Sequence, residues 1–261
     1  MNIVKKSFFA LVSAIVALCA VFFSANADNN AQGWYVKRNA EHKQPSLDSP
    51  LQYISKYNAY YVDTRKADSE DKVIYLTFDA GYENGNVEKI VDTLIKENVP
   101  AAFFLLDNII IKNTDLVNKM ADNNCLVCNH TLKHKEMTKV TDKKEFANEL
   151  ASLEAVYKEK TGKDMAKYYR PPEGKFNEQS LKFASELGYK TIFWSLAYAD
   201  WDNSNQPSEE YAKKKILDNT HNGAVILLHP TSETNAKILP DLIQEWKNQG
   251  YRFGTLDELT T

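Results

Sequence analysis

Short apolar runs alternate with longer amphipathic stretches along the chain from residue 73 onward. The runs are rich in β-branched and aromatic residues and predict seven strands, at residues 73–78, 101–106, 126–129, 168–170, 191–195, 224–228 and 252–254. Between them, apolar residues spaced three and four apart predict helices over residues 87–97, 143–160, 178–187, 208–219 and 235–249. Because strands and helices alternate, we expect an α/β fold with a parallel sheet.

The first 27 residues form a segment of different composition. Lys5 and Lys6 precede an uncharged apolar stretch over residues 8–23, and Ala25-Asn26-Ala27 supplies small residues for cleavage. This order of basic, apolar and small residues predicts a signal peptide on an exported, extracytoplasmic protein. The apolar stretch is only a little shorter than the ~20 residues of a membrane span, so an uncleaved N-terminal anchor is the alternative.

The rest of the chain divides near residue 70. Residues 28–70 are polar and turn-rich with scattered aromatic residues, which predicts an irregular N-terminal extension packed on a main domain of residues 71–261. Cleavage of the signal segment removes two lysines and no acids, so the formal charge changes from -3 to -5. We therefore do not expect this protein to bind nucleic acid.

Two cysteines, Cys125 and Cys128, remain after the signal segment. Residues three apart on a strand point to opposite faces of the sheet, which is poor geometry for a disulfide or a shared zinc ion. We expect neither a disulfide scaffold nor a zinc finger.

Polar residues that can carry chemistry follow several of the predicted strands. These residues are Asp79, His130, Arg170, Asp200 and His229, each at or just beyond a strand end. A barrel brings the carboxyl ends of its strands together around one mouth, whereas an open sheet keeps its outer strand ends apart. We therefore expect a barrel with one site at this mouth.

A second histidine, His134, lies four positions after His130. On a helical turn both imidazoles would face the same side and could bind one divalent metal ion. Two unrelated surface histidines are the alternative. His42 and His221 have no such setting, and we interpret them as surface residues.

Arg170 and Asp200 can each form an ion pair with another residue of this set. Arg170 could keep Asp79 ionised, because a nearby cation lowers the pKa of a carboxylate. Asp200 could pair with His229 and raise its pKa, so that the imidazole can act as an acid. A rigid loop with a surface arginine, and a structural histidine after an apolar strand, are the alternatives.

Five sequence motifs now resemble those of a known family, the polysaccharide deacetylases, also called the NodB-homology or carbohydrate esterase family 4 proteins. The motifs occur in the order Thr77-Phe78-Asp79-Ala80-Gly81, His130-Thr131-x-x-His134, Arg170-Pro171-Pro172-x-Gly174, Asp200-Trp201 and Leu227-Leu228-His229. The resemblance implies a distorted seven-stranded β/α barrel. It also implies a metal-dependent hydrolase that removes acetyl groups from a polysaccharide.

The resemblance assigns a role to each residue. Asp79 would be the catalytic base, with Arg170 tuning it, and His229 the acid, with Asp200 supporting it. His130 and His134 would be ligands of a divalent ion, zinc or similar. Trp201 and Leu227 would line the pocket for the acetyl methyl group, and the backbone N–H of Glu173 would stabilise the oxyanion.

The substrate implied is peptidoglycan, because segments such as Trp34-Tyr35-Val36-Lys37-Arg38-Asn39 resemble the branch of the family that acts on N-acetylmuramic acid. A monomeric enzyme of this branch would act on glycan strands after a muramoyl amidase has removed the stem peptides. The product would lead to muramic δ-lactam in spore cortex, which places the enzyme at the cell wall or in the forespore intermembrane space. A deacetylase of N-acetylglucosamine in peptidoglycan or chitin is the alternative enzyme.

Two positions depart from the family pattern. Ala80 stands where the wider family has a second aspartate that binds the metal, so we expect the ion to be held weakly. An inactive homologue that only binds glycan is therefore a third hypothesis. Glu173 stands where this branch usually has arginine, which reverses the charge that would meet the lactyl carboxylate of the substrate.

Overall fold

The computed structural model describes residues 30–38 and 41–261. The predicted signal segment, residues 1–27, lies outside the described residues. Within the described part of the chain, no helix is both long enough and apolar enough to cross a membrane.

The main sheet contains all seven predicted strands, and each boundary falls within a few residues of the prediction. They are β3 (Val73–Ala80), β4 (Ala101–Leu105), β5 (Cys125–Asn129), β6 (Tyr168–Tyr169), β8 (Lys190–Ile192), β9 (Ala224–Leu228) and β10 (Arg252–Phe253). All of their pairings are parallel, in the order β9-β3-β4-β5-β6-β8, with β10 beside the start of β3.

The sheet curls so that the segment after β8 reaches β9. Beyond β8 the chain continues to Leu196, which forms a parallel bridge with Ile226 of β9. The backbone N–H of Ser195 donates to the Val225 carbonyl at 2.9 Å, and that of Leu227 donates to the Leu196 carbonyl at 2.9 Å. The predicted α/β barrel is thus confirmed as a curled half-barrel of parallel strands.

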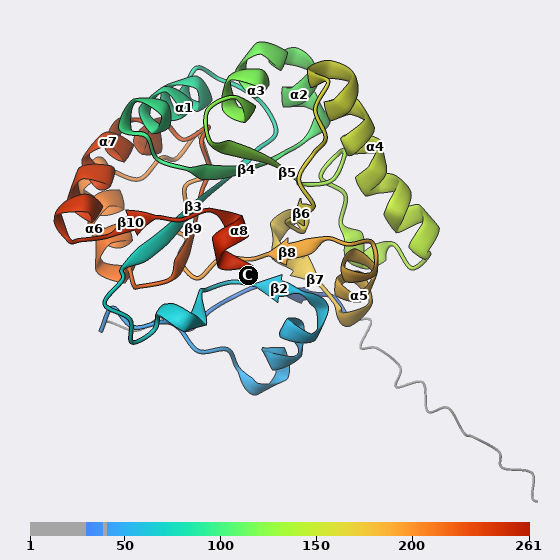
Figure 1. Ribbon diagram of the computed structural model, residues 1–261, viewed down its shortest axis with the longest axis horizontal. Coiled ribbons are helices and arrows are strands. Elements are labelled where there is room, and N and C mark those ends of the chain that lie inside the picture. The colour runs from blue at the N-terminus through green and yellow to red at the C-terminus, as the bar shows by residue number, and fades with distance from the viewer. Residues whose placement is uncertain (1–29, 39–40) are drawn as a thin grey trace, which may run out of the picture.

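Helices surround the curled sheet (Figure 1). The five predicted helices are present as α1 (Asn86–Glu97), α4 (Lys143–Thr161), α5 (Glu178–Glu186), α6 (Glu209–Asn219) and α7 (Glu233–Asn248). Local signals set their ends. In α4, for example, the side chain of Asp142 accepts a hydrogen bond from the backbone N–H of Glu145 at 2.8 Å, and Gly162 ends the helix with φ 73°.

Two adjacent helices, α2 (Asp107–Lys112) and α3 (Thr114–Ala121), were not predicted. Three consecutive isoleucines in α2 favour a strand by local propensity, and neither helix has a side-chain cap at its N-terminus. Tertiary packing stabilises them instead, because Ile109, Ile110 and Val117 are fully buried.

Alternate residues of the strands pack into two layers. Ile74, Leu76 and Phe78 of β3 belong to the core between the sheet and the outer helices. Tyr75 belongs to a second core inside the half-barrel, together with residues of the short C-terminal helix α8 (Leu256–Leu259). Figure 1 shows α8 within the ring of strands, so it fills the interior of the half-barrel.

The predicted N-terminal extension contributes strands to the fold. Its residues Ala59–Tyr60 form β2, which pairs in parallel with β8 at the edge of the main sheet. Gln32–Gly33 form β1, which pairs antiparallel with β7 (Lys175–Phe176). Trp34 stacks on Phe193 with ring centroids 4.2 Å apart and is only 7% exposed, so this segment shares a core with the barrel.

The two cysteines of β5 are free thiols, and both are buried. Cys125 packs in the core beneath the helices, whereas Cys128 packs in the core inside the half-barrel. The two side chains therefore lie on opposite faces of the sheet, as their spacing predicts.

Candidate active site

A cavity of about 760 Å³ opens at the carboxyl ends of the strands. Seven of the nine predicted site residues line it, namely Asp79, His130, His134, Glu173, Trp201, Leu227 and His229. The other two, Arg170 and Asp200, are 0% and 1% exposed and bond to Asp79 and His229 respectively. The fold thus brings all nine residues to one place.

Asp79 is the residue before the last one of β3, and Arg170 holds its carboxylate. Nη1 of Arg170 donates to Oδ1 of Asp79 at 2.7 Å. Burial by itself raises the pKa of Asp79, but the charge and hydrogen bond of Arg170, together with the charge of His229, lower it below its ordinary value. Asp79 is therefore a carboxylate kept ionised inside a largely buried site.

Thr77, which sequence reasoning missed, completes the support of Arg170. Nη2 of Arg170 donates to Oγ1 of Thr77 at 2.9 Å, and this hydroxyl donates to the Ile226 carbonyl at 2.7 Å. Nε of Arg170 donates to the Ile192 carbonyl at 2.8 Å. The period of two along β3 could have revealed Thr77, because it shares a face of the strand with Asp79.

His130 and His134 come together through a bend, and the predicted helical turn is wrong. Thr131 and His134 have φ values of 70° and 60°, and the backbone N–H of Thr131 donates to Oδ1 of Asn129 at 2.9 Å. The two imidazole ring centroids are nevertheless 5.0 Å apart. Left-handed backbone at two non-glycine residues is uncommon and points to a functional constraint on this loop.

The tautomer of His130 follows from its hydrogen bond. Its Nδ1 lies 2.9 Å from the Arg170 carbonyl, which can only accept, so Nδ1 carries the proton. Burial lowers the pKa of His130 to about 4, which keeps the ring neutral at pH 7. Its Nε2 lone pair is thus available to a metal ion, 3.7 Å from Oδ2 of Asp79.

The imidazoles of His130 and His134 suit only a weakly held metal ion with several coordination positions left open. Catalytic zinc sites have three protein ligands. Among residues 30–38 and 41–261, no group of three or more His, Cys, Asp or Glu side chains is arranged to hold a metal ion. Ala80 is 2% exposed and packs among the apolar side chains beneath the helices, so position 80 provides no ligand. The two imidazoles are the residues that could hold the ion.

His229 and Asp200 form the second polar pair of the cavity. Nδ1 of His229 lies 2.7 Å from Oδ1 of Asp200, and the backbone N–H of His229 donates to Oδ2 at 2.8 Å. Burial lowers the pKa of His229, but the hydrogen bond and charge of Asp200, with the charge of Asp79, raise it above its ordinary value. His229 is thus a histidine that retains its proton to higher pH.

Asp200 lies farther from the end of its preceding strand than predicted, because β8 ends at Ile192. Asn235 of α7, a residue that sequence reasoning missed, fixes the carboxylate. Its Nδ2 donates to Oδ2 of Asp200 at 2.6 Å and to the His229 carbonyl at 3.0 Å. Only the tertiary structure places Asn235 here, since no local pattern joins it to Asp200.

Glu173 lies in the loop that follows Arg170. It has φ 57° and ψ 11°, a left-handed conformation within the short 3-10 turn Pro172–Gly174. The carboxylate of Glu173 turns to Lys175, whose Nζ lies 2.7 Å away. Glu173 therefore lines the cavity while its side-chain charge is paired with Lys175.

Trp201 and Leu227 line the cavity with apolar side chains that differ in their exposure to solvent. Leu227 is 4% exposed, whereas Trp201 is 62% exposed, with its ring centroid 6.1 Å from that of His229. A large exposed aromatic side chain beside a cavity is available to stack on a ligand ring.

His221 is not a surface residue, and our sequence interpretation of it was wrong. It is 3% exposed, its Nδ1 lies 2.9 Å from the Asn219 carbonyl, and its Nε2 lies 2.9 Å from Oγ of Ser195. Because Oγ of Ser195 also accepts from the Val225 backbone N–H at 3.1 Å, His221 helps to join the ends of the sheet. His42 is exposed, as expected.

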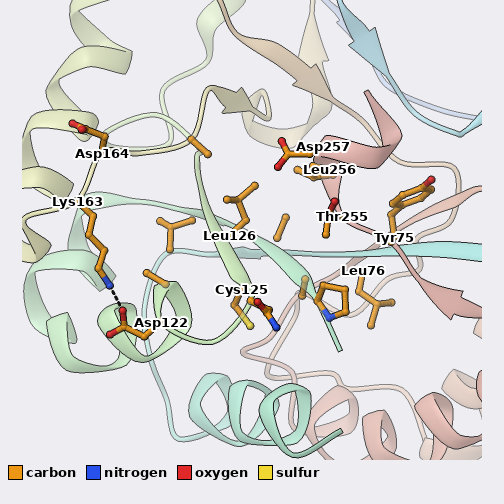
Figure 2. A pocket seen from close by; sticks show the side chains of 18 of the residues that line it. Tyr75, Leu76, Asp122, Cys125, Leu126, Lys163, Asp164, Thr255, Leu256 and Asp257 are labelled. Carbon is orange, nitrogen blue, oxygen red and sulfur yellow. Dashed lines mark hydrogen bonds and ion pairs between the residues drawn. The ribbon is translucent and has the colours of Figure 1, made fainter. Parts of the chain in front are cut away.

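A second cavity, of about 680 Å³, lies at the opposite ends of the strands (Figure 2). It is lined by the starts of β4 and β5 and by Asp257 of α8. Its charged groups are engaged within the protein, as in the pair of Lys163 with Asp122 and the bond from the Tyr168 hydroxyl to Asp257 at 2.5 Å. None of the nine predicted site residues lines this second cavity.

Comparison with known proteins shows the family to which the chain belongs. The family model for polysaccharide deacetylases matches residues 66–192. The chain belongs to the polysaccharide deacetylase family, carbohydrate esterase family 4.

Two known proteins illustrate how similar this chain is to individual members of the family. The peptidoglycan-N-acetylmuramic acid deacetylase PdaA of Bacillus subtilis is 40% identical over 233 residues, which cover 88% of this chain and 86% of the relative. The solved structure of that protein has a TM-score of 0.82 at 36% identity and is matched over 88% of this chain and 97% of its own. A family 4 pseudoenzyme from Bacillus anthracis has a TM-score of 0.68 at 26% identity, over 78% of this chain and 69% of its own.

Proposed function

We propose that this protein removes the acetyl group from N-acetylmuramic acid residues of peptidoglycan by hydrolysis. The observation that carries the proposal is that one cavity contains both a carboxylate with a lowered pKa and an imidazole with a raised pKa. The lowered pKa of Asp79 keeps its carboxylate ionised and therefore able to accept a proton, whereas the raised pKa of His229 keeps its imidazole protonated to higher pH and therefore able to donate one. Amide hydrolysis needs a base and an acid of this kind.

The reaction uses these groups in sequence. Asp79 takes a proton from the water molecule that attacks the acetyl carbonyl carbon. The backbone N–H of Glu173 stabilises the oxyanion that forms, a contribution of about 3 kcal/mol in comparable sites. His229 then donates its proton to the amine nitrogen as the carbon–nitrogen bond breaks, while Asp200 holds the imidazole in place.

His130 and His134 would hold a divalent ion, zinc or similar, weakly. When bound, such an ion supplies Lewis-acid polarisation and lowers the pKa of bound water towards ~7. The neutral state of His130, with its proton on Nδ1, supports this assignment. Binding is weak because Ala80 offers no third ligand.

The proposed substrate is that of the Bacillus subtilis relative, a peptidoglycan-N-acetylmuramic acid deacetylase. This protein acts as a monomer on glycan strands from which an amidase has removed the stem peptides. Its product closes to muramic δ-lactam in spore cortex. The signal-like segment at residues 1–27 supports export to the cell wall or the forespore intermembrane space, with an uncleaved anchor as the alternative.

The direct test is acetate release from peptide-stripped peptidoglycan, with and without added divalent ions, followed by muropeptide analysis. We expect acetate and deacetylated or lactam-containing products, with more acetate when ions are added. The Asp79→Asn variant, its folding checked by circular dichroism, should release none above background. A folded, metal-supplied wild type that releases no acetate would contradict the proposal.

A second enzymatic function differs only in substrate. Deacetylation of N-acetylglucosamine in peptidoglycan or chitin would use the same catalytic groups. Comparison of chito-oligomers with stripped glycan strands separates the two, because faster release of acetate from chito-oligomers would favour this alternative.

Ala80 favours a third candidate, an inactive protein that binds glycan. The Bacillus anthracis protein of similar fold is described as a pseudoenzyme of the same family. Calorimetry distinguishes this candidate from the first. Binding of glycan strands without binding of divalent ions and without acetate release would support it.

A further inference from the structure

The N-terminal extension brings a cation to the rim of the catalytic cavity. Arg38 lines this cavity together with Glu173 and Trp201. Its Nη2 donates a hydrogen bond to the carbonyl of Ala197, in the segment that leads to Asp200. Neither the family motifs nor the catalytic steps proposed above give Arg38 a role.

The backbone before Arg38 is held in place on the barrel. The backbone N–H of Trp34 donates to the Gly174 carbonyl at 2.9 Å, and its indole Nε1 donates to the Trp194 carbonyl at 2.8 Å. The hydroxyl of Tyr35 and Nζ of Lys37 each lie 2.6 Å from the carboxylate of Asp48. The guanidinium of Arg38 is therefore presented at the cavity by an anchored segment.

Among the residues that the structure describes, Arg38 also differs from the other charged groups of the cavity in having no charged partner. Asp79 pairs with Arg170, Glu173 with Lys175, and His229 with Asp200. Within the described residues, by contrast, no carboxylate forms an ion pair with Arg38, and the Ala197 carbonyl occupies only one of its five N–H donors. An exposed guanidinium with free donors at a substrate cavity is suited to bind an anionic group.

We infer that Arg38 binds the lactyl carboxylate of N-acetylmuramic acid and so selects this sugar over N-acetylglucosamine. The inference rests on the proposed function. The two sugars differ by the lactyl ether, which carries a carboxylate, and a planar guanidinium can donate two parallel hydrogen bonds to such a group. Glu173 cannot fill this role, because its charge has the same sign as the ligand and is already paired with Lys175.

The test measures binding separately from turnover. Stopped-flow quenching of the fluorescence of Trp194 and Trp201 gives affinities before hydrolysis for two ligands of equal length. One is peptide-stripped glycan with free lactyl carboxylates, and the other is the same glycan with those carboxylates reduced to alcohols. Wild type should bind the first about 10-fold more tightly, and added salt should reduce this preference.

Arg38→Gln should remove the preference, with about a 10-fold loss for the carboxylate ligand and no change for the reduced one. Lys37→Gln is the matched control, because Lys37 is the adjacent cation and faces Asp48 instead of the cavity. Lys37→Gln should still bind the carboxylate ligand more tightly than the reduced one, as the wild type does. Melting temperatures of both variants should stay close to that of the wild type.

The other outcomes are also informative. Equal losses for both ligands in Arg38→Gln would overturn the inference, because they would mean that Arg38 acts only by holding Ala197. Equal affinities of the wild type for the two ligands would overturn it as well. A wild type that prefers the carboxylate ligand but releases no acetate would uphold the role of Arg38 and reject the proposed catalysis.

Discussion

Arg170 donates from Nη1 to Oδ1 of Asp79 at 2.7 Å, and both side chains are almost removed from solvent. The two residues are 91 positions apart in the chain, at the ends of β6 and β3. A buried ion pair of this kind is costly to break from one side, because the remaining charge loses its compensation. The pair therefore affects both stability and the ionisation of the catalytic base.

Replacing Arg170 with methionine should lower the free energy of unfolding at pH 7 by about 3 kcal/mol, because Asp79 would remain as an unpaired buried charge. In the wild type the lowered pKa of Asp79 contributes stability above its unfolded value, and this contribution is lost as pH falls. In the variant, burial would raise the pKa, so protonation would relieve the destabilisation as pH falls. Urea unfolding should thus show that the difference in the free energy of unfolding between the wild type and the variant decreases as pH falls.

The double variant Arg170→Met/Asp79→Asn supplies the control. It should recover part of the lost stability at pH 7, because no charge is left unpaired. If it is less stable than Arg170→Met alone, the pairing explanation is wrong.

Asp200→Asn should shift the alkaline limb of kcat/KM to lower pH. His229 must be protonated to act as an acid, and Asp200 raises its pKa, so removal of the carboxylate charge lets the imidazole lose its proton sooner. We expect about a 100-fold loss of activity at pH 8. NMR titration of the imidazole should report the same downward shift of the pKa.

Asp202→Asn is the matched control for this change. Asp202 is exposed, and its carboxylate accepts from the backbone N–H of Ser204 at 2.9 Å instead of from a histidine. Its pH profile should stay that of the wild type. An unchanged alkaline limb in Asp200→Asn would show that His229 is not the acid.

Ala80→Asp should tighten binding of a divalent ion by at least about 10-fold, because it restores the aspartate that the wider family pattern has at this position as a metal ligand. Isothermal titration with zinc measures the change, and Ala80→Asn controls for side-chain size. Equal affinities for wild type and Ala80→Asp would mean that the new side chain stays directed toward the apolar core that Ala80 occupies.

Trp201→Ala should weaken substrate binding while leaving the fold intact. The side chain is 62% exposed, so the free energy of unfolding should change by less than about 0.5 kcal/mol. Loss of the stacking surface should raise KM about 10-fold with a small change in kcat. Tyr211→Ala, at an aromatic residue of α6 that is 55% exposed, should leave KM unchanged. An equal KM for Trp201→Ala and the wild type would exclude a role in binding.

Trp34→Ala should lower the free energy of unfolding by about 3 to 5 kcal/mol, because the indole is buried against Phe193. Chemical denaturation monitored by circular dichroism measures the loss. Tyr35→Ala, at an exposed neighbour, should cost much less. Similar small losses in both variants would mean that the N-terminal extension adds little to the stability of the barrel.

Much of the fold could be predicted because its signals are local. The alternation of apolar runs and amphipathic stretches predicts seven strands and five of the helices, all of which are present. The same signals failed at α2 and α3, where isoleucines favour a strand locally and burial decides otherwise.

The sequence by itself determined which chemical groups the protein carries and that they follow strand ends. Parallel strands in a curled sheet place those ends together, so residues at the strand ends, such as Asp79 and His229, gather at one mouth. Only the tertiary structure decided the contacts between distant segments. The bond of Asn235 to Asp200, the burial of His221 and the position of Arg38 depend on register and packing, which no local pattern encodes.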